Sequence, residues 1–262
     1  MLRHITSRDG TRIACETSGE GPPLVLVHGA GSARWTFDLV RPHLERDFEV
    51  IAIDRRGRGD STDAEGPYDL EREFEDVAAV VEDAGEDAVL VGHSYGALIS
   101  AGAASLIDGL PRMVLYEPPM GGVLAEPAFL DRLELLLERG ERDLLLREYL
   151  EVIGGYGEAE VEAMAAAPTW DARREIASTL PRELRTEHAH ELDAARLARL
   201  ELPVLMLIGT ESPEWARRST AAYAGALPNV TVHDLDGQGH GAAAGAPELL
   251  AGEIRAFAPG GR

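Results

Sequence analysis

Short apolar runs, each ended by glycine, proline or a charged residue, recur along the chain. Six of them have the length of a β-strand: residues 23–28, 48–54, 87–92, 112–117, 203–209 and 230–235. The first five are almost continuously apolar, which is typical of parallel strands that are covered on both faces. Residues 12–17 predict one further strand.

Helical patterns lie between these runs. They cover residues 35–44, 70–84, 94–107, 212–227 and 246–257. An alternation of strands and helices predicts an α/β fold, in which a mostly parallel sheet is doubly wound by helices on both faces.

One region breaks the alternation, because residues 119–201 contain no convincing strand pattern. Helical patterns appear there instead, at residues 128–139, 142–153 and 159–166. We therefore expect a core formed by residues 1–118 and 202–262, with a helical lid, or cap, inserted at 119–201. Open α/β sheets bind ligands beyond the carboxyl ends of their strands, so the lid is expected over that edge.

The composition is that of a globular chain with a sizeable core. It has 262 residues, of which 45% are hydrophobic. No apolar run approaches the length of a membrane span, and the first residues lack the apolar segment of a secretory signal. We therefore expect a cytoplasmic protein. Cys15 is the only cysteine, which excludes an internal disulfide and favours a small core residue.

The chain is strongly acidic, with a formal net charge of −21. Such a chain repels phosphate backbones and anionic lipid surfaces, so neither nucleic acid nor a membrane is an expected partner. All basic residues apart from histidine are arginine. Together with the many alanines and glycines, this indicates the codon bias of a GC-rich, bacterial genome; a salt-adapted surface is the alternative. The oligomeric state is left open.

The strongest chemical signal is the sequence Gly92-His93-Ser94-Tyr95-Gly96, which follows an apolar strand and opens an alanine-rich helix. This is the context of a G-x-S-x-G nucleophile elbow, in which a sharp turn exposes the serine hydroxyl. The positive end of the helix favours negative charge beside that hydroxyl. Ser94 is therefore the predicted nucleophile.

A serine hydroxyl needs a base that accepts its proton. Residues 236–241, Asp-Gly-Gln-Gly-His-Gly, follow the last predicted strand, and the glycines leave room for the imidazole of His240. The order of serine and then histidine near the chain end matches this mechanism. We expect His28 and His93, which flank the motifs, to form local hydrogen bonds.

An oxyanion hole requires two backbone N–H groups that point at the developing negative charge. The N–H of Tyr95 is expected to supply one, and that of Ala30, in the glycine-rich turn after residues 23–28, the other. A phosphate-binding loop is excluded because the chain has no lysine for that motif.

These motifs together resemble the α/β-hydrolase superfamily. The similarity rests on residues 28–31 (His-Gly-Ala-Gly), 54–61 (Asp-Arg-Arg-Gly-Arg-Gly-Asp-Ser), 92–96 and 237–240, and extends from about residue 11 to 257. It implies the fold and a serine–histidine chemistry, with no metal or organic cofactor. The turn at 54–61 is implied to be structural.

The acid of the catalytic triad departs from the family pattern. In most relatives an Asp follows the strand that corresponds to residues 203–209, but here Ser212 occupies that place. A hydroxyl cannot stabilise an imidazolium as a carboxylate does. Some members carry the acid after the preceding strand, where this chain has Glu117. We therefore favour Glu117 as the acid, with Glu211 as the competitor.

The identity of the nucleophile limits which reactions the protein can catalyse. Serine forms an acyl-enzyme, which suits esters, lactones, thioesters and amides, whereas relatives that open epoxides or displace halide use an Asp at the elbow. The expected substrate is a small, fairly apolar molecule, contacted by Trp35, Met120 and Trp170. The alternatives are a cofactor-free relative that performs perhydrolysis or carbon–carbon cleavage, or a small-molecule receptor with a slow triad.

Overall fold

The computed structural model describes residues 1–122, 124–167 and 169–258. The chain forms two compact units. The first, here called the core, comprises Met1–Gly29, Ala33–Pro119 and Leu192–Arg262. The second, here called the insertion, comprises Ala30–Ser32 and Met120–Glu191.

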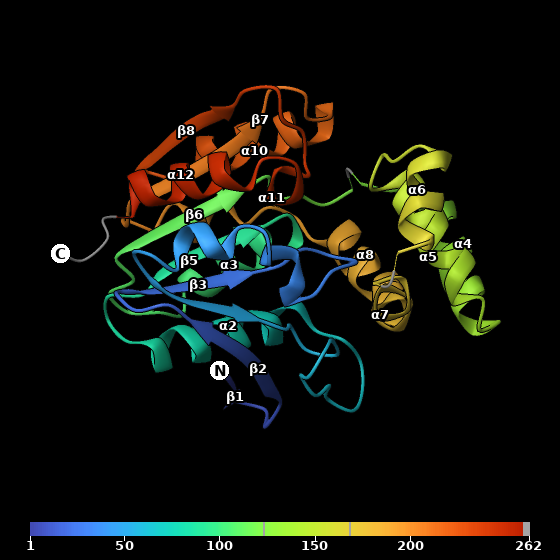
Figure 1. Cartoon of the computed structure of the whole chain (residues 1–262), viewed down its shortest axis with the longest axis horizontal. Coiled ribbons are helices and arrows are strands. Elements are labelled where there is room, and N and C mark those ends of the chain that lie inside the picture. Colours follow the sequence, from blue (N-terminus) through green and yellow to red (C-terminus); the bar gives the residue numbers. More distant parts are fainter. Residues whose placement is uncertain (123, 168, 259–262) are drawn as a thin grey trace. The chain divides into compact units, whose positions relative to one another are not determined.

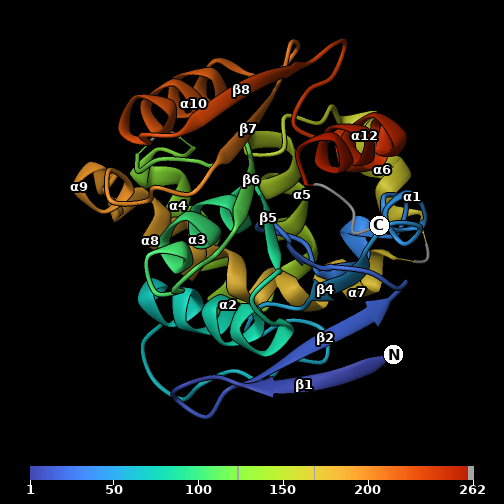
Figure 2. The same cartoon turned by 90° about the vertical axis from the view of Figure 1, so that its left-hand side faces the viewer.

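The core is built on one sheet, which has eight strands within the described residues, in the order β1-β2-β4-β3-β5-β6-β7-β8. β1 and β2 are antiparallel to their neighbours, and the pairs from β4 to β8 are parallel. Figure 2 shows this order from bottom to top for the labelled strands, with β3 unlabelled between β4 and β5. The predicted α/β fold with a mostly parallel sheet is confirmed. The strands are β1 (Leu2–Thr6), β2 (Arg12–Ser18), β3 (Pro23–Val27), β4 (Glu49–Ile53), β5 (Val89–His93), β6 (Arg112–Tyr116), β7 (Val204–Gly209) and β8 (Val230–Leu235).

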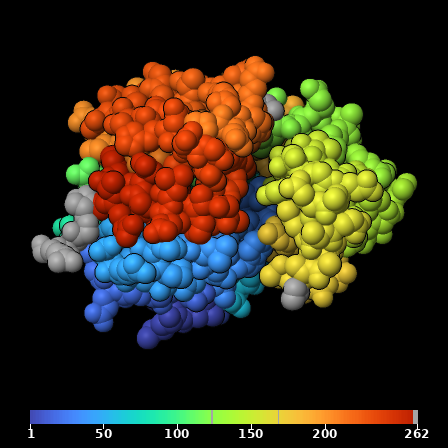
Figure 3. Space-filling model, turned by 45° about the horizontal axis from the view of Figure 1, so that its top comes forward, coloured from blue at the N-terminus to red at the C-terminus, as the bar shows by residue number. Residues whose placement is uncertain are grey.

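Helices cover both faces of the sheet, which explains why β3 to β7 are apolar almost throughout. On one face, α2 (Leu70–Ala84) packs beside α3 (Tyr95–Ala104); on the other, α1 (Arg41–Leu44) packs beside α12 (Pro247–Phe257) (Figures 1 and 2). In the space-filling view, the red C-terminal segment adjoins the light-blue segment that contains α1 (Figure 3). β8 lies at the edge and is mostly exposed.

The structure corrects one predicted helix and adds elements. Residues 35–44 form a 3-10 helix, η1 (Arg34–Phe37), and the short α1 rather than one helix. Pro42 has no N–H for a helical bond to residue 38, so a continuous helix is interrupted there. The added elements are β1 and the one-turn helices α9 (Ala194–Leu197) and α11 (Ala242–Gly245). α10 (Glu214–Ala226) follows β7 as expected.

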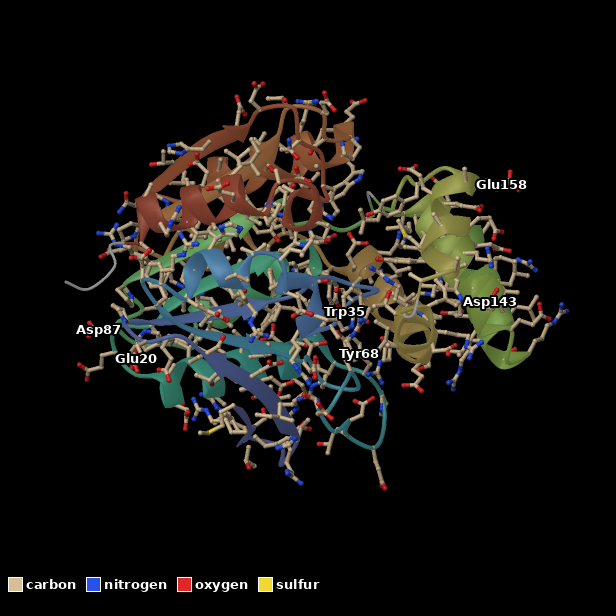
Figure 4. All side chains as sticks on the ribbon, in the orientation of Figure 1. Glu20, Trp35, Tyr68, Asp87, Asp143 and Glu158 are labelled. Atoms are coloured by element: carbon tan, nitrogen blue, oxygen red, sulfur yellow. The ribbon has the colours of Figure 1, made fainter. Side chains whose placement is uncertain are left out.

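The parallel strands bring the loops that carry the motifs to one edge of the sheet. Glu20 and Asp87 precede β3 and β5, and they lie at the amino end of the core in Figure 4. Trp35 and Tyr68 follow β3 and β4, and they lie at the carboxyl end. Residues that directly follow β5 and β6 therefore belong to the same edge as Trp35.

The insertion is helical, and its described residues contain no strand. It has its own apolar core, formed by leucines of several helices together with Tyr149, Val161 and Trp170. Its placement as a lid stays a prediction. Among the described residues, no helix is long and apolar enough to cross a membrane. The helices of the insertion are α4 (Pro127–Glu138), α5 (Arg142–Val152), α6 (Glu158–Ala165), α7 (Trp170–Ile176), η2 (Ala177–Thr179) and α8 (Leu180–Ala189).

Candidate active site

Ser94 lies on the sharp turn between β5 and α3. Its backbone has φ 55° and ψ −127°, a conformation that L-residues rarely adopt. Glycines make the turn possible: a Cβ on Gly92 would lie 2.5 Å from the Cα of Ala97, and a Cβ on Gly96 would clash with the carbonyl oxygen of Val27. The sequence thus folds locally as a strained strand–helix turn, as the motif predicts.

The turn is tied to the neighbouring strands. The N–H of Ser94 donates to the carbonyl oxygen of Tyr116, at 2.8 Å, where β6 ends. On the other side, Gly29 approaches so closely that a Cβ there would lie 2.8 Å from the Cβ of Ser94. Strands β3, β5 and β6 together therefore fix the position of the serine.

Glu117 is the residue after β6, and it is fully buried. Its φ is 49°, which makes it, with Ser94, one of the two non-glycine residues of positive φ in the described chain. Its carboxylate accepts hydrogen bonds from the N–H of Gly209, at 2.9 Å, and from the hydroxyl of Ser212. The predicted contact with His240 is present, because Oε2 of Glu117 lies 2.5 Å from Nδ1 of His240.

These contacts keep the carboxylate charged. Burial opposes ionisation and would raise the pKa of Glu117, but the hydrogen bonds from His240, Gly209 and Ser212 outweigh it and lower that pKa. Ser212 stands where an Asp was expected, and its hydroxyl holds the Glu instead. Glu211, the competing acid, is exposed, and none of its described contacts reaches His240.

His240 is surrounded by aromatic rings. Its ring centroid lies 4.7 Å from that of His93, 5.1 Å from that of Trp215 and 6.1 Å from that of Tyr116. Trp215, in the first turn of α10, meets the imidazole nearly at right angles. The imidazole of His240 is thus packed on several sides by rings of the core, while part of its side chain remains exposed.

The turn after β3 is held by His28, which is completely buried. Its Nε2 accepts from the N–H of Arg55, at 3.2 Å, so Nδ1 carries the proton and donates to the carbonyl oxygen of Gly29, at 2.8 Å. Burial, with the nearby Arg55 and Arg58, lowers the pKa of His28 well below its usual value. His28 is therefore a neutral structural residue that forms local hydrogen bonds, as expected.

The two predicted oxyanion donors lie in different units. Tyr95 is the first residue of α3, and the first N–H groups of a helix are not used by the helix's own hydrogen bonds. Ala30 belongs to the insertion, and its role as the second donor stays a prediction. Its neighbour Gly31 packs closely against the ring of Tyr149, within that unit.

A buried polar network holds the side chain of Tyr95 in place. Its hydroxyl lies 3.1 Å from that of Tyr68, which donates to Glu73 at 2.8 Å. Glu73 also pairs with Arg55 at 3.0 Å, and the guanidinium of Arg55 lies over the Tyr95 ring. The side chain of Tyr95 is thus part of the packed core, which leaves its backbone for the predicted role.

The turn at residues 54–61 is structural, as expected. The Asp54 carboxylate accepts from the N–H groups of Arg34, at 2.9 Å, and Asp60, at 3.0 Å. It also pairs with the guanidinium of Arg34. This network joins the turn to the segment that follows the glycine-rich loop.

The predicted substrate contacts are spread over both units. Trp35 lies in η1, at the carboxyl end of the core (Figure 4), and Met120 is at the start of the insertion. Trp170 is buried inside the insertion, where its indole N–H donates to Asp143 at 2.7 Å and its ring lies under the guanidinium of Arg147. These contacts give Trp170 a packing role; a contact with substrate stays a prediction for all three residues.

Sequence reasoning missed Trp215, for which no motif gives a signal. Its nearness to His240 depends on how α10 follows β7. The position of Ser212 was a usable signal, because a polar residue at the usual acid position is well placed to hold the carboxylate that replaces it. Among the described residues, no group of His, Cys, Asp and Glu could hold a metal ion.

Comparison with known proteins agrees with this fold. The crystal structure of an α/β hydrolase from Sphaerobacter thermophilus is 36% identical and superposes with a TM-score of 0.86, over 97% of this chain and 99% of that one. A non-heme haloperoxidase of Rhodococcus erythropolis is 39% identical over 95 residues, 35% of this chain and 34% of the relative. A bifunctional esterase/perhydrolase of Acinetobacter calcoaceticus is 38% identical over 100 residues, 36% of each. The chain thus spans about a third of the length of these two curated relatives.

A parallel sheet wound by helices, with a strained serine at the turn after its central strand, defines the class of α/β-hydrolase proteins. Residues 24–253 match the alpha/beta hydrolase family, and the chain belongs to it.

Proposed function

We propose that the protein is a serine hydrolase that cleaves carboxylic ester, lactone or thioester bonds of a small, fairly apolar substrate. The observation that carries the proposal is the buried Glu117 carboxylate, which contacts His240 next to the strained Ser94 turn. A buried, ionised carboxylate bound to a histidine Nδ1 has a clear use in catalysis, because it stabilises the imidazolium that forms during acyl transfer.

In this mechanism His240 removes the proton of the Ser94 hydroxyl, whose oxygen attacks the substrate carbonyl carbon. The negative oxygen of the tetrahedral intermediate is stabilised by the N–H groups of Tyr95 and Ala30. The imidazolium of His240 then protonates the leaving alcohol or thiol, and an acyl-enzyme remains. A water molecule, deprotonated by His240, releases the acid and restores the serine.

Glu117 fulfils the role of the triad acid. Its contact with Nδ1 fixes the tautomer in which Nε2 of His240 faces the nucleophile, and its charge stabilises the imidazolium. The hydroxyl of Ser212 and the N–H of Gly209 hold the carboxylate in that orientation.

The insertion supplies the lid. It leaves the core after Pro119, two residues beyond Glu117, so the chain itself ties its first residues, beginning with Met120, to the edge that carries the acid. Trp35 and Met120 provide apolar contacts for the substrate. The net charge of −21 disfavours anionic substrates.

The proposal is tested by labelling with a fluorophosphonate, followed by turnover of a panel of p-nitrophenyl esters. We expect the wild-type protein to be labelled on Ser94 and to turn over short-chain esters. Ser94→Ala should lose the label and about 10⁶-fold in kcat, because the acyl-enzyme cannot form. Comparable turnover by this variant, with an unchanged circular dichroism spectrum, would contradict the assignment.

A second candidate is perhydrolysis, which the names of two relatives favour: a non-heme haloperoxidase and an esterase/perhydrolase. Here hydrogen peroxide takes the place of water at the acyl-enzyme, and the product is a peroxy acid. Its formation from an ester and hydrogen peroxide, measured against hydrolysis in the same sample, separates the two reactions. A receptor with a slow triad would instead give a single burst of p-nitrophenol without turnover.

A further inference from the structure

The loop that carries His240 is held by two aromatic side chains of neighbouring strands. The Nε2 of His93, the last residue of β5, lies 2.9 Å from the carbonyl oxygen of His240, so this hydrogen bond spans the chain and is not the local one that we expected. The hydroxyl of Tyr116, the last residue of β6, donates to the carbonyl oxygen of Gly239 and accepts from the N–H of Ala242, at 3.3 Å. Backbone groups of residues 239, 240 and 242 are thus held by the last residues of β5 and β6, the strands that Ser94 and Glu117 directly follow.

The two side chains also support each other. The rings of His93 and Tyr116 are stacked, with centroids 4.9 Å apart and planes inclined by 29°. The His93 ring lies against the imidazole of His240 at the same time. Any displacement of His93 would therefore disturb both the loop backbone and the ring of the base.

The chemistry of His93 suits this place. A carbonyl oxygen only accepts, so Nε2 of His93 must carry the proton. Burial, with the nearby His240, lowers the pKa of His93 to about 3, so the ring stays neutral. A neutral donor can hold the loop without adding a second positive charge beside the imidazolium of His240. Glu117 contacts His240 at Nδ1.

We propose that His93 and Tyr116 are positioning residues that keep the Nδ1 of His240 aligned with Glu117. Neither side chain needs to touch the substrate; they act through the backbone of residues 239–242. The proposal rests on the proposed function only for its effect on rate, since the alignment of His240 with Glu117 can be observed without turnover.

The test compares His93→Leu, His93→Gln and Tyr116→Phe with the wild type. Leu fills space but cannot donate a hydrogen bond, whereas the terminal amide of Gln can replace the donor at Nε2. His233→Leu and His233→Gln are matched controls, because His233 lies at the edge of the sheet and pairs with Glu253, far along the strand order from β5. Two quantities are measured: the kinetic constants over pH, and the downfield proton NMR signal of the His240 Nδ1–H, assigned by its loss in Glu117→Gln.

We expect His93→Leu to lower kcat roughly 10- to 100-fold with KM within about twofold, since misplacement of a catalytic group by 1 Å has an effect of this size. The NMR signal should broaden or shift upfield, and the acid limb of kcat/KM should move. His93→Gln should recover most of the rate and the signal. Tyr116→Phe removes one oxygen atom, so it should fold and show the same changes to a smaller extent.

The positioning role is overturned if His93→Leu keeps its rate and its signal, or if the rate falls while the signal is unchanged. It is also overturned if His93→Gln is no better than His93→Leu. A wild-type protein that hydrolyses none of the esters would contradict the proposed function, whereas the NMR comparison would still decide the positioning role.

Discussion

Among the buried glutamates, Glu117 in the core and Glu187 in the insertion have opposite environments. Glu117 in the core accepts hydrogen bonds from His240, Ser212 and Gly209, and these lower its pKa despite complete burial. Glu187, on α8 of the insertion, is also buried, but Oε1 has no partner among the described residues. Burial alone raises the pKa of Glu187 to about 8.

The difference shows that burial alone does not determine whether a carboxyl group is charged. With donors around it, the group is a charged carboxylate that can stabilise a cation. Without them, it is a neutral acid at pH 7, and its ionisation opposes folding. The hydrogen-bond partners determine the charge state, and Glu117 has the partners that its proposed catalytic role requires.

The largest effect is expected for Glu117→Gln. The amide has the same shape but no charge, so it cannot stabilise the imidazolium of His240, and kcat should fall about 10³- to 10⁴-fold. The rate is measured with the best p-nitrophenyl ester. Glu211→Gln, which changes the exposed competitor in the same way, is the control and should retain nearly full activity. A damaging Glu211→Gln would transfer the role of the acid to Glu211.

The next effect concerns stability. The pKa of Glu187 in the folded protein, about 8, lies above the ordinary glutamate value of 4.5, so the folded protein binds more protons than the unfolded chain between these pH values. Stability should therefore fall as pH rises from about 4.5 to 8, by up to about 1.4 kcal/mol per pH unit.

Glu187→Gln should remove this fall and stabilise the protein by a few kcal/mol at pH 8, as measured by urea denaturation at several pH values. Glu138→Gln, an exposed substitution on α4, should leave the pH profile of the wild type unchanged. A Glu187→Gln variant that still loses stability between pH 5 and 8 would show that another group is responsible.

The smallest effect is expected for Ser212→Ala. Loss of its hydroxyl removes one of the donors that lower the pKa of Glu117, so that pKa should rise. A lowered carboxyl pKa stabilises the fold above the unfolded value, and this contribution is lost as pH falls through the folded value. Acid unfolding of Ser212→Ala should therefore begin at a higher pH.

Ser212→Ala should also lose about tenfold in kcat, equivalent to one hydrogen bond to a charged group. Ser105→Ala, at the end of α3, is the control for the loss of a hydroxyl. If acid unfolding and rate match the wild type, Ser212 does not determine the state of Glu117.

Much of the fold could be predicted from the sequence because parallel strands buried on both faces leave a strong apolar signal. The prediction of secondary structure failed where the local sequence pattern was misleading or absent. Residues 35–44 have a helical pattern, but Pro42 divides them. β1 is a partly exposed edge strand without an apolar run, so nothing marked it.

The candidate site could be predicted where a residue directly follows a strand or stands in a recognisable motif. Ser94 and Glu117 directly follow adjacent parallel strands, which bring them to one edge, and His240 stands among glycines after the last strand. Contacts through side chains from later elements could not be predicted. The ring of Trp215 contacts His240 because of the direction in which α10 follows β7. The hydrogen bonds of the Tyr116 hydroxyl to Gly239 and Ala242 depend on a loop conformation that no sequence pattern encodes.

The positive φ angles of Ser94 and Glu117 have a consequence for the engineering of this protein. Glycine adopts such angles without steric cost, whereas other residues lose about 1–3 kcal/mol there. Glycine could relieve this strain at Ser94, but at 117 it would also remove the buried carboxylate that His240, Gly209 and Ser212 hold. A selection for thermal survival that does not also demand turnover would therefore favour Ser94→Gly and an inert protein, whereas Glu117 and its strained backbone would be retained for the sake of the fold.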